Sequence, residues 1–125
     1  MRRLYNPGMQ LVHDLERLAE GEESLFRRQL LREDVARLRT LEALAASAPD
    51  FPSFAKTGMR LGWTQGDART GELREPLERL LAEVYDVRKG TGDEARLVQA
   101  WNELHRTRME RLLGCLSTPV PKPTG

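Results

Sequence analysis

Cysteine is almost missing from this chain of 125 residues, since Cys115 is the only one. A single cysteine excludes an intramolecular disulfide, which agrees with a reducing compartment, and we expect a cytoplasmic protein. Cys115 stands among leucines in the sequence, where burial would suppress the reactive thiolate. A small core residue is therefore favoured over a nucleophile at this position.

Long hydrophobic runs are also missing. The longest apolar runs are a few residues, far short of the roughly 18 needed for a membrane-spanning helix. At the N-terminus Arg2 and Arg3 resemble the basic start of an export signal, but Asp14 and Glu16 arrive before an apolar segment could form. We expect neither an export signal nor a membrane partner.

An excess of one charge sign is the third absence. Twenty Lys and Arg oppose 19 Asp and Glu, which gives a net charge of +1. This balance argues against a protein that binds polyanions through bulk charge, so any such contact would depend on a local patch.

Motifs for chemistry are absent as well. The two histidines, His13 and His105, have no Glu-x-x-His or Cys-x-x-Cys spacing that would favour a metal site. No glycine-rich phosphate loop is present. We therefore predict no catalytic residues, no metal, no cofactor and no enzymatic activity.

Helical periodicity is what the sequence does have, and it predicts an all-α domain of about four helices in a compact, mostly antiparallel bundle. The first begins at Asn6-Pro7 and ends or bends at Gly21, and the second runs from about Glu22 to Ala48. The third begins near residues 70–73 and runs to Arg88, and the fourth ends near Ser117. Their predicted core stripes are Leu11, Leu15, Leu18; Leu31, Val35, Leu38, Leu41, Ala45; Leu73, Leu77, Leu80, Val84, Val87; and Leu97, Trp101, Leu104, Leu112, Leu116.

One long segment interrupts the helices. Residues 49–71 contain two Pro, four Gly and three of the seven aromatic residues. We interpret them as a loop that crosses one end of the bundle, with room for a short helix from Ser53 to Arg60, capped by Ser53.

The last two predicted helices should form a hairpin across Lys89-Gly90-Thr91-Gly92. Thr91 and Glu94 have the spacing of a capping box, in which each side chain bonds to the backbone N–H of the other residue. Beyond this hairpin, Pro119, Pro121 and Pro123 predict an extended tail. The expected organisation is one helical domain, residues 1–118, followed by a proline-rich mobile tail, residues 119–125.

Two groups of residues are candidate binding sites. Helical projection places Arg28, Arg32 and Arg39 on one ridge beside the core stripe of the second helix, where they could contact phosphates or the carboxylates of a partner. The alternative is a solvated flank with local salt bridges. The second group is the predicted partner-binding loop, in which aromatic residues that could anchor an interface alternate with bases: Phe51, Phe54, Lys56, Arg60, Trp63 and Arg69.

The aromatic residues of this loop have an alternative role, because they could fold inward as a plug over the bundle. His105 presents a similar choice. It projects onto the apolar side of the last helix with Trp101 and Arg108, and a packed histidine bonded to a neighbour is favoured over a titrating site.

These observations favour a non-catalytic interaction or assembly subunit of a larger complex, with another protein or a second copy as partner. The alternative is a small subunit that contacts the nucleic-acid backbone in a ribonucleoprotein or DNA-processing complex, a role like that of the helical small subunits of CRISPR effectors. A third hypothesis is a helical regulator or inhibitor that docks on an enzyme.

Overall fold

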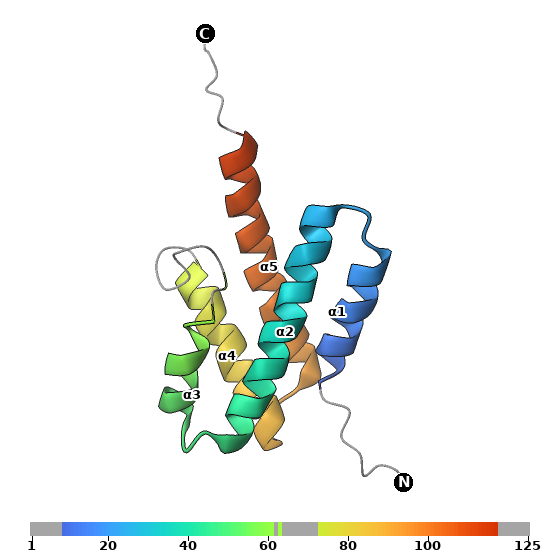
Figure 1. Cartoon of the computed structure of the whole chain (residues 1–125). Helices are drawn as coiled ribbons and strands as arrows, with labels where there is room; N and C mark the ends of the chain where they lie inside the picture. The colour runs from blue at the N-terminus through green and yellow to red at the C-terminus, as the bar shows by residue number, and fades with distance from the viewer. Residues whose placement is uncertain (1–8, 62, 64–72, 118–125) are drawn as a thin grey trace.

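The computed structural model describes residues 9–61, 63 and 73–117, and side chains as far as Arg111. All regular structure in these residues is α-helical, which confirms the predicted class (Figure 1). The described part of the chain holds five helices rather than the predicted four. They are α1 (Gln10–Gly21), α2 (Leu25–Ser47), α3 (Phe51–Gly58), α4 (Arg74–Lys89) and α5 (Glu94–Ser117).

Helices α1 and α2 form an antiparallel hairpin. Gly21 is the last residue of α1, as predicted, and Glu22 leaves the helix with extended backbone angles. Ser24 then caps α2, because its hydroxyl accepts a hydrogen bond from the Arg27 backbone N–H at 3.3 Å. The turn between the two helices is therefore only three residues long, 22–24.

Two backbone donors at the start of α1 bond to other helices. Met9, the residue before α1, has no side-chain cap, but its backbone N–H donates to Glu42 Oε2 on α2 at 2.8 Å. The Gln10 N–H donates to Glu94 Oε2 on α5 at 3.4 Å. The predicted cap at Asn6-Pro7 lies outside the described residues.

Helix α3 is the element that changes the helix count. Asp50, not Ser53, caps it, since the Asp50 carboxylate accepts from the Ser53 N–H at 2.9 Å. The helix lies alongside α4 rather than crossing an end of the bundle (Figure 1). A short helix was allowed inside this segment, but its packing depends on contacts with distant residues that local sequence does not encode. Residues 62 and 64–72 lie outside the description.

The hairpin of α4 and α5 is present as predicted, but the capping box is wrong. Gly90 adopts the left-handed conformation at φ 87°, and the Thr91 N–H bonds to Asp86 O at 2.9 Å, so Thr91 closes α4. The Asp93 carboxylate accepts from the Ala95 N–H at 2.9 Å and thus serves as the cap of α5. Glu94 instead extends to α1.

The core confirms most of the predicted stripes. On α2 every predicted stripe residue is buried, and on α4 all are buried except Val87, which is partly buried. Leu97, Trp101 and Leu104 are buried on α5, whereas the side chains of Leu112 and Leu116 are outside the description. Leu18 was wrongly assigned to the core. It is 56% exposed, because the buried face of α1 turns toward Leu11, Val12, Leu15 and Ala19.

Helices α2 and α4 run in the same direction, because α3 returns the chain between them (Figure 1). Helix α5 runs antiparallel to both and extends past the α1–α2 turn. Within the described residues, the Cα atoms of α2 and α5 stay more than 8 Å apart. Long side chains must therefore bridge these two helices. None of the described helices is long and apolar enough to span a membrane.

The corrected cap of α5 gives a test. Asp93→Ala should lower the free energy of unfolding by about 1 kcal/mol, because it removes the side-chain acceptor at the helix start. Thr91→Ala should cost less, since the Thr91 hydroxyl makes only a 3.4 Å bond to Asp86 O in the preceding turn. Urea denaturation of the two variants measures the difference, and a larger loss for Thr91→Ala would restore the capping box.

Candidate functional site

A buried carboxylate is the centre of a polar site within the described core. Asp34 has no exposed surface, although it lies on the core face of α2 between Leu31 and Leu38. An ionised carboxylate in such a position is costly unless charged groups and hydrogen bonds compensate it. The surroundings of Asp34 supply both.

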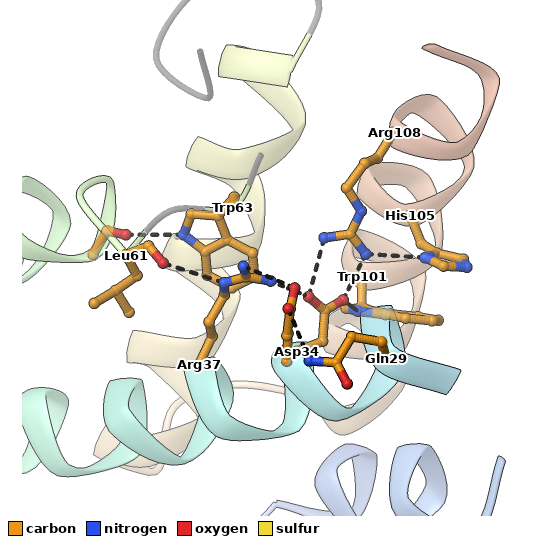
Figure 2. A network of polar contacts seen from close by, with 10 residues as sticks. Gln29, Asp34, Arg37, Leu61, Trp63, Trp101, His105 and Arg108 are labelled. Carbon is orange, nitrogen blue, oxygen red and sulfur yellow. Dashed lines mark hydrogen bonds and ion pairs between the residues drawn. The ribbon is translucent and has the colours of Figure 1, made fainter. Parts of the chain in front are cut away.

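Asp34 accepts four hydrogen bonds, two on each oxygen (Figure 2). Arg108 on α5 donates through both of its terminal nitrogens, at 3.0 Å to Oδ1 and 2.6 Å to Oδ2. The Trp101 indole N–H donates to Oδ2 at 2.8 Å, and Arg37 donates to Oδ1 at 3.0 Å. The carboxylate thus has no acceptor site left for a ligand.

Arg37 connects this centre to the segment after α3. Its Nε donates to the Leu61 carbonyl at 3.2 Å, and its guanidinium carbon lies 5.4 Å from the centre of the Trp63 ring. Arg37 also pairs with Glu33 at 3.5 Å. The charges of two arginines, Arg37 and Arg108, therefore balance those of two acids on α2, Glu33 and Asp34.

Trp63 lies inside the molecule, not on its surface. Only 1% of it is exposed, and its indole N–H donates to the Gly58 carbonyl at 2.9 Å. Phe54 is buried as well, while Phe51 is partly buried and packs edge-on against Tyr85 at 5.4 Å. An interface anchor at Trp63 would need an exposed ring, and the inward plug is the arrangement found. The physical reason is that Arg37 and Gly58 provide partners for the ring inside the fold.

Two basic residues of the same segment lie on the surface of the molecule. Lys56 and Arg60 are exposed, and Arg69 lies outside the described residues. Whether any of these residues binds a partner stays a prediction.

The three arginines of the predicted ridge have different surroundings. Arg39 is paired with Glu16 on α1, and Arg28 donates to the Glu22 carbonyl at 2.7 and 3.1 Å. Arg32 is exposed and has no hydrogen bond or ion pair within the described part of the chain. Two members of the ridge therefore stabilise the α1–α2 hairpin, and their contact with phosphate remains a prediction.

His105 is the titratable group beside the buried ion pair. Its ring stacks on Trp101 at 4.6 Å, and its Nδ1 lies 3.0 Å from Arg108 Nη2. Since arginine can only donate, Nδ1 is the acceptor and the ring is neutral in this arrangement. Burial lowers the pKa of His105, the Arg108 charge lowers it further, and Asp34 opposes the shift. The predicted packed histidine is confirmed.

The buried cluster has little capacity for acid–base chemistry. Asp34 is saturated with donors, and arginine does not deprotonate in proteins. Within the described residues, no group of three or more His, Cys, Asp or Glu side chains is arranged to hold a metal ion. What the cluster can do is fix α2, α5 and the segment at Leu61 relative to one another.

A second feature lies at the α1–α2 turn. Three large hydrophobic side chains near this turn are exposed, namely Leu18 (56%), Leu25 (75%) and Phe26 (46%). Leu18 is in the last turn of α1, and the other two begin α2. We call these three residues the hairpin-end cluster.

The sequence contained a signal for the buried pair that the prediction missed. Asp34 interrupts the apolar stripe of α2, and Arg108 follows Leu97, Trp101 and Leu104 on the stripe of α5. One acid and one base that each stand on a core face are expected to pair, because neither can be buried alone. The sequence pattern predicts Arg108 beside His105 on the apolar side of the last helix, but the apolar stripe of α2 gives no role to Asp34.

Comparison with protein-family models, with curated proteins and with solved structures gives no match to this chain. Functional proposals for the protein therefore depend on its own residues.

The buried pair predicts strong energetic coupling. Asp34→Ala and Arg108→Met should each destabilise the fold by about 3–5 kcal/mol, because each leaves an uncompensated charge or donor in the core. The double variant should cost clearly less than the sum, since the remaining charge is removed with its partner. Urea denaturation of the wild type, the two single variants and the double variant measures this coupling energy.

The exposed pair Arg74 and Glu78 is the matched control, for which a coupling energy of about 0.5 kcal/mol or less is expected. Additive losses at Asp34 and Arg108 would contradict the assigned pairing.

The lowered pKa of His105 predicts a pH dependence. In the unfolded chain the imidazole gains its proton near its ordinary pKa of 6.5, whereas the folded protein resists protonation until lower pH. Stability should be full above this value and should decline as pH falls from 6.5 toward the folded pKa. Thermal melts across this range should show the decline in the wild type and a weaker one in His105→Gln. Identical profiles would remove His105 as the cause.

Proposed function

We propose that this protein is a non-catalytic assembly subunit that binds another polypeptide through the hairpin-end cluster of Leu18, Leu25 and Phe26. The observation that carries the proposal is the exposure of these three side chains near one turn, whereas the other large hydrophobic side chains that the structure describes are buried or partly buried.

The free energy for such binding would come from burying the apolar surface of these three side chains, which the fold leaves exposed to water. Burying a Leu or Phe side chain contributes about 1.5–3 kcal/mol, and residues that anchor an interface commonly include aromatics. Scattered exposed hydrophobic residues need no explanation, but three of them within nine residues of chain, on both sides of a short turn, favour a contact surface.

Charged residues surround this cluster with both signs. Arg17 and Glu20 flank it on α1, and Glu23 and Arg27 flank it at the turn and on α2; all four are exposed. An apolar centre with a polar rim is the usual anatomy of a protein interface. The mixed signs also suit a second copy of the chain, because acids and bases could face each other across a twofold axis.

The nucleic-acid alternative has less support on α2. Arg39 and Arg28 make contacts within the fold, so Arg32 is the ridge residue left open for a phosphate among those predicted. The buried cluster around Asp34 does not favour an enzyme, because its carboxylate is fully engaged.

A pair of double variants tests the assembly role. Leu25→Glu with Phe26→Glu should abolish recovery of the native complex and, if the partner is a second copy, should leave a monomer in sedimentation velocity. Ala36→Glu with Ala43→Glu is the matched control, because it adds the same charge at exposed positions of the same helix. The control should keep the wild-type behaviour.

Both variants should retain the wild-type melting temperature within a few degrees, since the altered side chains contribute little to the core. Equal recovery of the complex from the two double variants would refute the proposed surface. A wild-type protein that is monomeric and isolates alone from its native source would refute the assembly role itself.

A further inference from the structure

A basic depression lies between α3 and α4, away from the hairpin-end cluster. It has a volume of about 260 Å³ and is lined by Lys56 in the last turn of α3, by Met59 and Arg60 directly after that helix, and by Arg74 and Glu78 in the first turns of α4. These two helix segments lie next to each other because α3 packs along α4 (Figure 1). The fold thus joins bases that are far apart in the sequence.

The lining has an excess of positive charge. Three cationic side chains face one acid, Glu78, and that acid already pairs with Arg74 at 3.1 Å. Lys56 and Arg60 have no acidic partner within the described residues, and both are exposed. Met59 is partly buried against the core and provides an apolar wall. The site therefore combines cationic groups with an apolar wall.

The start of α4 adds to the positive potential. Leu73, the residue before α4, provides no side-chain cap. The acid in the first turn, Glu75, pairs with Arg79, with Oε2 and Nη2 3.4 Å apart, so its negative charge is balanced. The N-terminal end of a helix carries a partial positive charge that attracts anions, and Arg74, the first residue of α4, adds a full positive charge at the same place. The helix end alone would not make a site, but it adds to the positive charge of the three side chains.

The geometry points to a phosphate-binding site in this depression, formed by Lys56, Arg60 and Arg74. Guanidinium groups bind phosphate oxygens through two parallel hydrogen bonds, and lysine adds a point charge. The volume is slightly below that of pockets for drug-sized ligands, so the site suits one phosphate group with its immediate attachment. The phosphate could belong to a small molecule or to a nucleic-acid strand.

The primary experiment is a titration with pyrophosphate at low ionic strength, followed by two-dimensional NMR of the amide and arginine Nε–H signals. Shifts should concentrate at Lys56, Arg60 and Arg74 and their helical neighbours. Arg60→Gln and Arg74→Gln should each weaken binding by about tenfold, the loss expected for one charge-assisted contact. Arg96→Gln removes an equal charge from an exposed position on α5 and should have no effect.

Glu78→Gln provides a test with the opposite sign. This variant frees Arg74 from its acid and removes a negative charge from the lining, so affinity for pyrophosphate should increase. All altered side chains here are exposed, so melting temperatures should stay near that of the wild type. No pyrophosphate binding would overturn the proposal, and so would equal losses in Arg60→Gln, Arg74→Gln and Arg96→Gln.

A second titration, with a single-stranded oligonucleotide, identifies the source of the phosphate. Tighter binding than pyrophosphate, with affinity falling with salt at a slope of about −2 on logarithmic axes, would assign the site to a strand contacted at up to three phosphates. Binding of pyrophosphate but not of the oligonucleotide would assign it to a small molecule. Both results support a phosphate site, and neither depends on the hairpin-end cluster.

Discussion

The buried charge of Asp34 is the constraint around which this fold is organised. A carboxylate without exposed surface is stable only if donors occupy both oxygens, and those donors come from α2 itself and from α5. The space between these helices is too wide for direct backbone packing, and Trp101 and Arg108 bridge it. Because Arg37 also bonds to Leu61 O, the same centre fixes the chain after α3. The polar cluster thus sets the relative positions of three parts of the fold.

Much of the helical architecture could be predicted from the sequence, because apolar residues at helical spacing leave few alternatives. The stripes of α2 and α4 were found this way, and the end of α1 at Gly21 followed from glycine's low helix propensity. Caps were less predictable. Thr91 and Glu94 fit a local pattern, yet Thr91 closes the preceding helix and Asp93 caps the next one. Two adjacent helix ends compete for the same few residues, and local spacing does not decide between them.

The candidate sites were harder to predict because exposure is a tertiary property. Trp63 and Phe54 stand among glycines, prolines and bases, which favours a loop, and only the neighbouring helices show that they are inside. Leu18 shows the opposite error. The apolar pattern predicts that it lies in the core, but the orientation of α1 exposes it. The sequence shows Lys56 and Arg60 as bases of this segment, but their proximity to Arg74 depends on the packing of α3 against α4. Pairings between distant segments are what a single sequence leaves open.

The contacts at the start of α1 affect how this helix detaches from the rest of the fold. Its first backbone donors bond to Glu42 on α2 and Glu94 on α5, and no side chain of Met9 caps them. Short helices are marginal in isolation, so contacts with both neighbours stabilise the start of α1. Conversely, detachment of α1 releases two carboxylates that belong to different helices. The first helix should therefore not fray independently but exchange its amide hydrogens as one cooperative unit with the ends of α2 and α5.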